Sequence, residues 1–193
     1  MKPMKVVAFN GSPRRNGNTH LLIQQVFKAL NKKGIKTEEI QVGGNLVHGC
    51  IACYQCFKKK DNRCIQKDKV NGWIDKMRKA DGIILASPTY VADITPELKA
   101  LIDRSGLVAI ANDRFLKRKV GAAVLAVRRA GAIHAFDTIN HFFLIQEMIV
   151  PGSCYWNMGY GREKGEVKKD KEGMKTMDVL GKNMAWLMKR VCS

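Results

Sequence analysis

The stretch that decides the fold, residues 4–30, reads MKVVAFNGSPRRNGNTHLLIQQVFKAL. Its first part, 4–10, is a short apolar run, and the Gly-Ser-Pro that follows is typical of a turn. From Asn18 the apolar residues recur at helical spacing on one face, until Gly34 offers a natural helix end. The stretch therefore predicts a buried strand, a polar loop and an amphipathic helix.

The same alternation of strand-like and helix-like segments continues along the chain. Apolar runs predict buried strands, an alternating run predicts an edge strand, and periodic stretches predict the helices between them. The expected strands are 4–10, 35–42, 82–87, 119–127 and 148–151, and the expected helices are 18–33, 68–80, 95–105, 133–148 and 174–191. Asp68 is expected to cap the second of these helices. The stretch 152–173 shows little pattern and is expected to be a surface excursion.

Strands that alternate with helices and carry almost continuous apolar runs form parallel sheets covered on both faces. Five strands in this order predict an α/β fold, a flavodoxin-like doubly wound sheet with strand order 2-1-3-4-5. We expect this domain to cover residues 1–151, with a cysteine-rich loop at 43–67, and residues 152–193 to add an excursion and a C-terminal helix. Such sheets bind ligands beyond the carboxyl ends of their strands, so the loops after Asn10, Ser87 and Val127 are the ones to examine.

Composition and charge exclude several classes of protein and indicate the charge of a partner. Hydrophobic residues make up 46% of the 193 residues and charged ones 26%, which excludes a disordered or collagen-like chain. Lys and Arg outnumber Asp and Glu by 34 to 17, and the net charge of +17 favours an acidic partner. No stretch reaches the ~20 apolar residues of a membrane span. At the N-terminus only Val6–Phe9 is apolar, which is shorter than the ~7–15 residues of a signal peptide. We therefore expect a cytoplasmic protein without a membrane partner, whose cysteines stay reduced.

The loop after the first strand is suited to an anion. The loop carries hydroxyl, amide and guanidinium groups, and its glycines leave backbone N–H groups accessible. It leads into a helix N-terminus, where N–H groups attract negative charge. The candidate binding residues are Ser12, Arg14, Asn16, Gly17, Asn18 and Thr19. The loop is neither a Walker A loop nor a dinucleotide fingerprint. A terminal monophosphate held without metal fits it, and FMN is the usual ligand of that kind in this fold; a polar turn with a helix cap is the alternative.

The other two loops are suited to a flat ring. Thr89 and the neighbouring backbone can hydrogen-bond a polar ring edge, and Tyr90 can stack on a ring face. Arg128, in the loop that ends at Gly131, offers positive charge to a reduced, anionic ring. A simple strand-ending turn and solvated arginines are the alternatives.

Four cysteines stand in one run: Cys50, Cys53, Cys56 and Cys64. The first three, at intervals of three, can wrap a compact loop round one inorganic cluster, and the fourth can close the site. Bacterial ferredoxins use a related run with a shorter last gap and a following proline. Zinc on four thiolates, or no metal, are the alternatives. Cys154 and Cys192 stand alone and are expected to be buried or surface thiols.

In their order along the chain, the segments 11–19, 50–64, 80–84, 87–91 and 98–104 resemble the NADPH-dependent FMN reductase branch of flavodoxin-like proteins, and within it the iron–sulfur flavoproteins. The resemblance covers roughly residues 4–151. It implies FMN phosphate contacts at Ser12, Arg14, Asn16, Asn18 and Thr19, and ring contacts at Pro88, Thr89, Tyr90 and Val91. It also implies a [4Fe–4S] cluster on Cys50, Cys53, Cys56 and Cys64, and a homodimer or homotetramer.

We therefore expect an FMN-dependent oxidoreductase whose [4Fe–4S] cluster passes electrons between a donor, ferredoxin or NAD(P)H, and a small-molecule acceptor. An acidic carrier such as ferredoxin would be attracted by the positive charge. One alternative is a cluster-free NAD(P)H-dependent FMN or quinone reductase. Another, from a different class, is a zinc-stabilised nucleic-acid-binding module with basic patches at 58–60, 114–119 and 164–175. We expect no acid–base catalytic residue.

Overall fold

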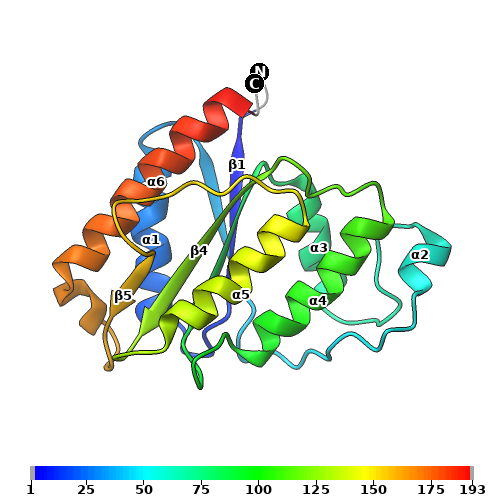
Figure 1. The fold of residues 1–193 in the computed structure, drawn as a ribbon, viewed down its shortest axis with the longest axis horizontal. Coiled ribbons are helices and arrows are strands. Elements are labelled where there is room, and N and C mark those ends of the chain that lie inside the picture. Colours follow the sequence, from blue (N-terminus) through cyan, green and yellow to red (C-terminus); the bar gives the residue numbers. More distant parts are fainter. Residues whose placement is uncertain (1–2, 192–193) are drawn as a thin grey trace.

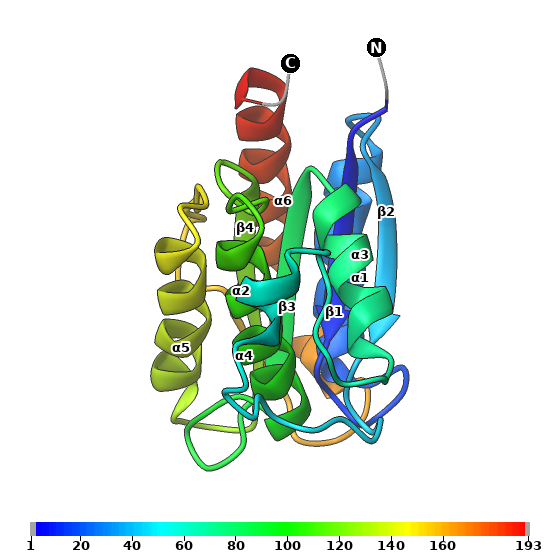
Figure 2. The ribbon, with the colours of Figure 1, turned by 90° about the vertical axis from the view of Figure 1, so that its right-hand side faces the viewer.

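The computed structural model is a parallel sheet with helices on both faces (Figure 1), and it describes residues 3–191. The strands are β1 (Lys5–Asn10), β2 (Lys36–Gln41), β3 (Gly82–Pro88), β4 (Val120–Val127) and β5 (Met158–Tyr160). They pair in the order β2-β1-β3-β4-β5, and every pair is parallel. Figure 2 shows this order from β4 to β2. The predicted doubly wound sheet and its strand order are confirmed.

The helices divide between the two faces. The core on one face joins the sheet to α3 (Val70–Lys79), α4 (Pro96–Ala111) and α5 (Ala132–Ile145). The core on the other face joins it to α1 (Asn18–Asn31) and α6 (Lys171–Val191). A short helix, α2 (Gln55–Lys59), interrupts the cysteine-rich segment, and a 3₁₀ turn, η1 (Glu166–Lys169), precedes α6. Within residues 3–191 no helix has the length and apolar character to cross a lipid bilayer.

The central strands are apolar because both of their faces are buried. Val7 of β1 belongs to the core with α3, α4 and α5, whereas its neighbour Val6 belongs to the core with α1 and α6. All residues of β4 are buried, while β2 at the sheet edge is only half-buried. Apolar burial at about 25 cal/mol per Å² is the main stabilising contribution in such a sheet. It also holds the carboxyl ends of β1, β3 and β4 side by side.

The fifth strand lies later in the chain than predicted. Residues 148–151 make only one isolated bridge, between Ile149 and Val120, and β5 follows at Met158–Tyr160. The predicted strand at 148–151 is therefore wrong, because Pro151 has no N–H with which to continue a ladder. The expected surface excursion at 152–173 is wrong in part, since β5 extends the sheet within it and Val167 is buried in the core.

The remaining predicted elements are present with shifted ends. Helix α4 continues to Ala111 instead of ending at 105, and α2 was not predicted. Asp68 was expected to cap the helix that begins near it, and its Oδ1 accepts a hydrogen bond from the N–H of Val70 at 3.1 Å. Cys154 is an exposed free thiol, whereas Cys192 lies outside the described residues.

Candidate functional site

The carboxyl ends of β1, β3 and β4 border a cavity of about 280 Å³. Three loops that are far apart in the sequence meet there, as the parallel arrangement of the strands requires. The predicted cofactor-binding residues that line it are Ser12, Arg14, Gly17, Asn18, Thr19, Pro88, Thr89, Tyr90 and Arg128. We call this cavity the phosphate cavity.

Three predicted residues, Asn16, Val91 and Gly131, lie in the same loops but do not line the phosphate cavity. Asn16 and Val91 have positive φ angles of 54° and 48°, which are uncommon for residues with a side chain, and Val91 is fully exposed. At Gly131 (φ 84°) a Cβ would lie 3.2 Å from the Cα of Ala92, so the loops after β3 and β4 touch at this glycine. Direct contacts of these three residues with a cofactor stay a prediction.

The N-terminus of α1 forms one wall of the phosphate cavity. Its N-cap is Gly17, no side chain caps it, and no acidic residue lies in its first turn. The first N–H groups and the positive end of the helix dipole therefore have no compensating carboxylate in this helix. Ser12 and Thr19, which bring hydroxyl groups to the cavity, are only 4% and 1% exposed. This arrangement of N–H and O–H donors fits a phosphate group.

A further wall was not predicted from the sequence. It consists of Gly161, Arg162 and Lys164, from the loop between β5 and η1, together with Ala126 at the end of β4. Arg162 and Lys164, together with Arg14 and Arg128, bring four cationic side chains to the cavity. The described lining of the cavity includes no Asp or Glu. The signal in the sequence is the pair of basic residues Arg162 and Lys164 between two glycines, in the stretch predicted to be a surface excursion.

The side chain of Asn18 holds this loop against α1. Its Nδ2 donates to the carbonyl oxygens of Gly161 and Glu163, each at 3.0 Å. Its Oδ1 accepts from the N–H groups of Gly165 at 2.9 Å and Val167 at 3.4 Å. Both donors and both acceptor positions of the amide are therefore used within the protein. Asn18 lines the cavity, but its side chain acts as a brace between α1 and the loop 161–167.

Two further contacts shape the same loop. Oε2 of Glu166 accepts hydrogen bonds from the N–H groups of Glu163 at 2.9 Å and Arg162 at 2.8 Å, and these bonds lower the pKa of Glu166. Nη1 of Arg14 donates to the carbonyl oxygen of Arg162 at 3.3 Å. The loop is thus held in its cavity-forming shape by the protein itself.

Asn18→Ala is expected to expose the loop 161–167 to trypsin, which cleaves after Arg and Lys. The variant loses four hydrogen bonds, each with a net contribution of about 1 kcal/mol, so cleavage after Arg162 or Lys164 should become at least ~10-fold faster. The matched control is Asn183→Ala, because Asn183 donates to the carbonyl oxygen of Gly152 in another part of the molecule. Mass spectrometry of the fragments identifies the sites of cleavage. If trypsin cleaves the loop of the Asn18 variant and of the parent protein at the same rate, Asn18 does not brace the loop.

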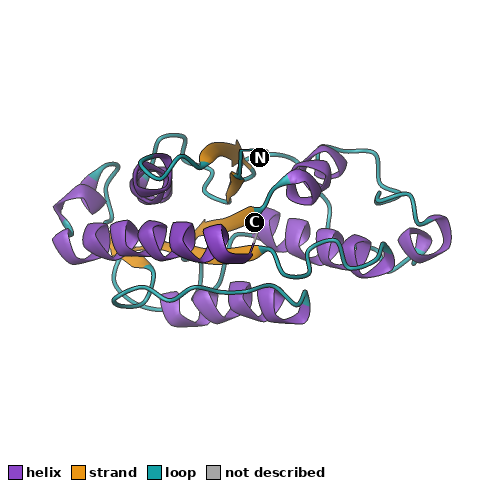
Figure 3. Cartoon of the chain, turned by 90° about the horizontal axis from the view of Figure 1, so that it is seen from above, coloured by secondary structure: helices purple, strands orange, loops and turns teal. Residues whose placement is uncertain are grey.

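The four cysteines of the predicted cluster motif gather at another place. Their segment, with α2, lies at the end of the long axis of the molecule away from α6 (Figures 1 and 3). All four line one small cavity of about 20 Å³ together with Arg104 of α4, which was not predicted as a site residue. We call this group of cysteines the cysteine centre. Positive φ angles at Ala52 (50°) and Tyr54 (52°) turn the chain sharply between the cysteines.

The thiols of the cysteine centre are free. Cys50 and Cys53 are exposed, Cys56 and Cys64 are half-buried, and burial raises the pKa of Cys56. In the described part of the chain, no three His, Cys, Asp or Glu side chains group closely enough to hold a single metal ion. Four thiolates around one cavity are the donor set that a [4Fe–4S] cluster takes, with its ligands spread over several iron atoms. The residues of the centre therefore fit such a cluster.

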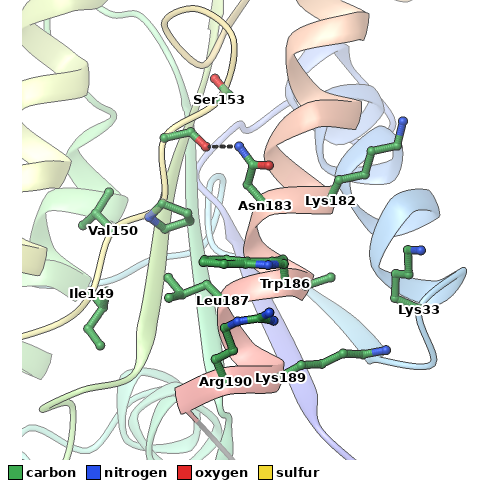
Figure 4. Close-up of a pocket in the computed structure, with 13 residues that line it drawn as sticks. Lys33, Ile149, Val150, Ser153, Lys182, Asn183, Trp186, Leu187, Lys189 and Arg190 are labelled. Carbon is green, nitrogen blue, oxygen red and sulfur yellow. Dashed lines mark hydrogen bonds between the residues drawn. The ribbon is translucent and has the colours of Figure 1, made fainter.

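A larger cavity of about 990 Å³ lies between α6 and the segment before β5 (Figure 4). Trp186 of α6 is 58% exposed there, and the guanidinium carbon of Arg190 lies 4.4 Å from the centre of its ring. This cavity is near the amino ends of the strands, since its residue Ile149 pairs with Val120 at the start of β4. Because doubly wound sheets bind ligands at the carboxyl ends, the smaller phosphate cavity is the candidate cofactor site.

Comparison with known proteins gives the family of the chain. Residues 4–163 match the sequence profile of the family described as NADPH-dependent FMN reductase. The chain belongs to this family. A curated relative from Methanocaldococcus jannaschii, named an iron–sulfur flavoprotein, is 38% identical over 97% of this chain and 99% of its own. A relative of the same name from Methanosarcina thermophila is 33% identical over 94% of this chain and 93% of its own.

Family membership makes the chain a flavin-dependent oxidoreductase of the iron–sulfur flavoprotein and FMN reductase group. Solved structures add the fold. A flavodoxin-type, WrbA-like protein from Agrobacterium tumefaciens superposes with a TM-score of 0.68 and 13% identity, over 98% of this chain and 99% of its own. RosB with a bound riboflavin-phosphate intermediate superposes with a TM-score of 0.73 and 18% identity, over 98% of this chain and 80% of its own. The nucleic-acid-binding alternative gains no support from these comparisons.

Proposed function

We propose that this family member is an electron-transfer enzyme in which FMN at the phosphate cavity exchanges electrons with a [4Fe–4S] cluster on Cys50, Cys53, Cys56 and Cys64. The observation that carries the proposal is that one chain holds two separate groups of side chains, one suited to a phosphate and the other to an iron–sulfur cluster. One is a cationic cavity at an uncapped helix N-terminus, and the other is four free thiols around a second cavity. The family description supports FMN, and the names of the relatives support the cluster.

When bound, FMN would supply the chemistry of accepting electrons from a donor and passing them on. The N-terminal N–H groups of α1 and the hydroxyls of Ser12 and Thr19 would hold its phosphate, and Arg14 and Arg128 would offset its charge. Residues 88–91 would lie along its ring. Tyr90 is 45% exposed, so its ring face is accessible for stacking. NAD(P)H or ferredoxin is the proposed donor, and a small molecule the acceptor.

The visible spectrum of anaerobically purified protein tests this function directly. We expect the bands of oxidised flavin on the broad absorbance of an iron–sulfur cluster, with about four irons per flavin. Flavin without iron would support the cluster-free reductase. A colourless protein that takes up neither flavin nor iron would contradict the proposal.

We propose an acidic electron carrier such as ferredoxin as the macromolecular partner, because the chain carries a net charge of +17. Raising the ionic strength from about 0.01 to about 1 M shortens the Debye length from about 30 to about 3 Å. The second-order rate of electron transfer with such a carrier should then fall at least ~10-fold in stopped-flow measurements. An uncharged quinone serves as the control acceptor and should change little. If the rate constant with the carrier does not change with ionic strength, the positive charge of the protein does not attract the carrier.

We propose that the protein works as a homodimer or homotetramer in the reducing cytoplasm. Support for self-association comes from large apolar side chains that are more than half exposed. Leu144 and Ile145 of α5 are each 64% exposed, and Trp156 is 53% exposed. Leu144 and Trp156 line a shared cavity of about 560 Å³, and exposed apolar patches of this kind often mark contact surfaces. Free thiols at the cysteine centre suit a reducing compartment.

A further inference from the structure

Arg104 of α4 is the one charged residue in the described part of the chain that is almost fully buried, with 1% exposure. It lies beside the cysteine centre, not beside the phosphate cavity. A guanidinium group is always charged, so its burial is costly unless every N–H finds an acceptor. The partners of Arg104 therefore reveal what this residue does.

Two of these partners are the carboxylate oxygens of Asp68. Nη1 donates to Oδ2 at 2.5 Å and Nη2 donates to Oδ1 at 2.9 Å, which makes a bidentate pair. Burial opposes the charge on Asp68, but the hydrogen bonds and the positive charge of Arg104, together with the N–H of Val70 and the His48 side chain, lower the pKa of Asp68. The pair joins α4 to the end of the cysteine-rich segment, just before α3.

The other three N–H groups bind the cysteine-rich segment itself. Nη1 also donates to the carbonyl oxygen of His48 at 3.1 Å, and Nη2 to that of Gln66 at 3.4 Å. Nε donates to Sγ of Cys64 at 3.3 Å. The five donors of the guanidinium thus meet five acceptors, on both sides of the cysteine run. The hydrogen bond to Sγ of Cys64 is therefore one of five that together satisfy the guanidinium group.

We infer that Arg104 is a positioning residue of the cysteine centre, which clamps the segment 48–68 and stabilises negative charge on the sulfur of Cys64. This inference rests on the proposed function where it concerns the cluster. Hydrogen bonds to ligand sulfur tune cluster potentials. A reduced cluster carries one more electron than an oxidised one, so an N–H donor and a positive charge beside Cys64 favour the reduced form. Arg104 therefore raises the reduction potential of the cluster.

The first test uses the full-length apoprotein and needs no cluster. Arg104→Gln removes the charge and most of the donors, so the segment should open more often and expose Cys64. Modification of Cys64 by a maleimide, followed by mass spectrometry, should become at least ~10-fold faster, because several mutually supporting bonds are lost. Cys154, an exposed free thiol outside the centre, is the internal control and should react as before. Unchanged reactivity of Cys64 would overturn the clamp.

The second test measures the midpoint potential of the anaerobically reconstituted protein by a redox titration followed by electron paramagnetic resonance. Arg104→Gln should disfavour reduction by about tenfold, which is about 59 mV to more negative potential for one electron. Arg104→Lys keeps the charge but not the planar fork, and should give a smaller shift in the same direction. The control is Asp103→Asn on the same helix. It should leave the midpoint potential nearly unchanged, because Asp103 pairs with Lys99 at the surface.

The outcomes separate this inference from the proposed function. A parent protein that binds no iron would defeat the cluster assignment, while the maleimide test would still decide the clamp. If Arg104→Gln takes up no iron, the potential of Arg104→Lys decides instead. An Arg104 variant that holds its cluster at the parental potential would overturn the tuning role.

Discussion

Thr19→Asp is expected to weaken the binding of FMN to the apoprotein by at least ~100-fold. Thr19 is the second residue of α1, is 1% exposed and lines the phosphate cavity. A carboxylate about 4 Å from a phosphate charge costs about 4 kcal/mol at the effective dielectric constant of a protein surface. An aspartate in the first turn of a helix is favourable for the helix itself, so the new charge should not weaken α1. Quenching of flavin fluorescence on titration measures the affinity.

Thr19→Asn is the matched control, because it has the size of the aspartate variant without its charge. We expect it to lose less than ~10-fold in FMN affinity, the scale of one hydrogen bond. Riboflavin, which lacks the phosphate, provides a second control and should bind the two variants about equally. If the Asp and Asn variants bind FMN with equal affinity, the phosphate does not lie at the N-terminus of α1.

Cys53→Ala is expected to remove nearly all of the iron from the anaerobically purified protein. A [4Fe–4S] cluster is held by four thiolates, and Cys53 stands in the middle of the motif as an exposed residue whose loss leaves no buried void. Uptake of FMN should persist, because the phosphate cavity is built by other loops. Iron and flavin analysis of the same sample checks both expectations.

Cys154→Ala is the control for this experiment, since Cys154 is an exposed free thiol outside the cysteine centre. It should retain both iron and flavin. Reduction of the acceptor should fall with the iron in Cys53→Ala and stay unchanged in Cys154→Ala. Full iron in Cys53→Ala would disprove the assigned ligands, and loss of iron with unchanged acceptor reduction would favour the cluster-free reductase.

The elements that could be predicted from the sequence are those whose local pattern reflects their surroundings. β3 and β4 are buried on both faces, so their residues form almost continuous apolar runs. The loop after β1 joins a buried strand to an amphipathic helix, and its polar residues are close in sequence as well as in space. These features are local, and the order of the strands follows from them by the rules of parallel sheets.

Features that depend on distant contacts could not be predicted in this way. β5 has only three residues and is placed by its pairing with β4, and the N–H of Leu125 in β4 also donates to the carbonyl oxygen of Asn157, just before β5. Lys164 reaches the phosphate cavity because Asn18, far away in the sequence, holds its loop. Arg104 lies on a helix whose pattern is otherwise ordinary, and its partner Asp68 was recognised only as a helix cap.

The central claim is that the protein holds FMN by its terminal phosphate at the carboxyl ends of β1, β3 and β4. The most direct measurement compares the dissociation constants of FMN and riboflavin for the same full-length apoprotein. Because charge-assisted hydrogen bonds contribute about 1.5–3 kcal/mol each, two of them to the phosphate predict that FMN binds at least ~100-fold more tightly than riboflavin. Equal affinities for the two flavins, or no uptake of either, would contradict the claim.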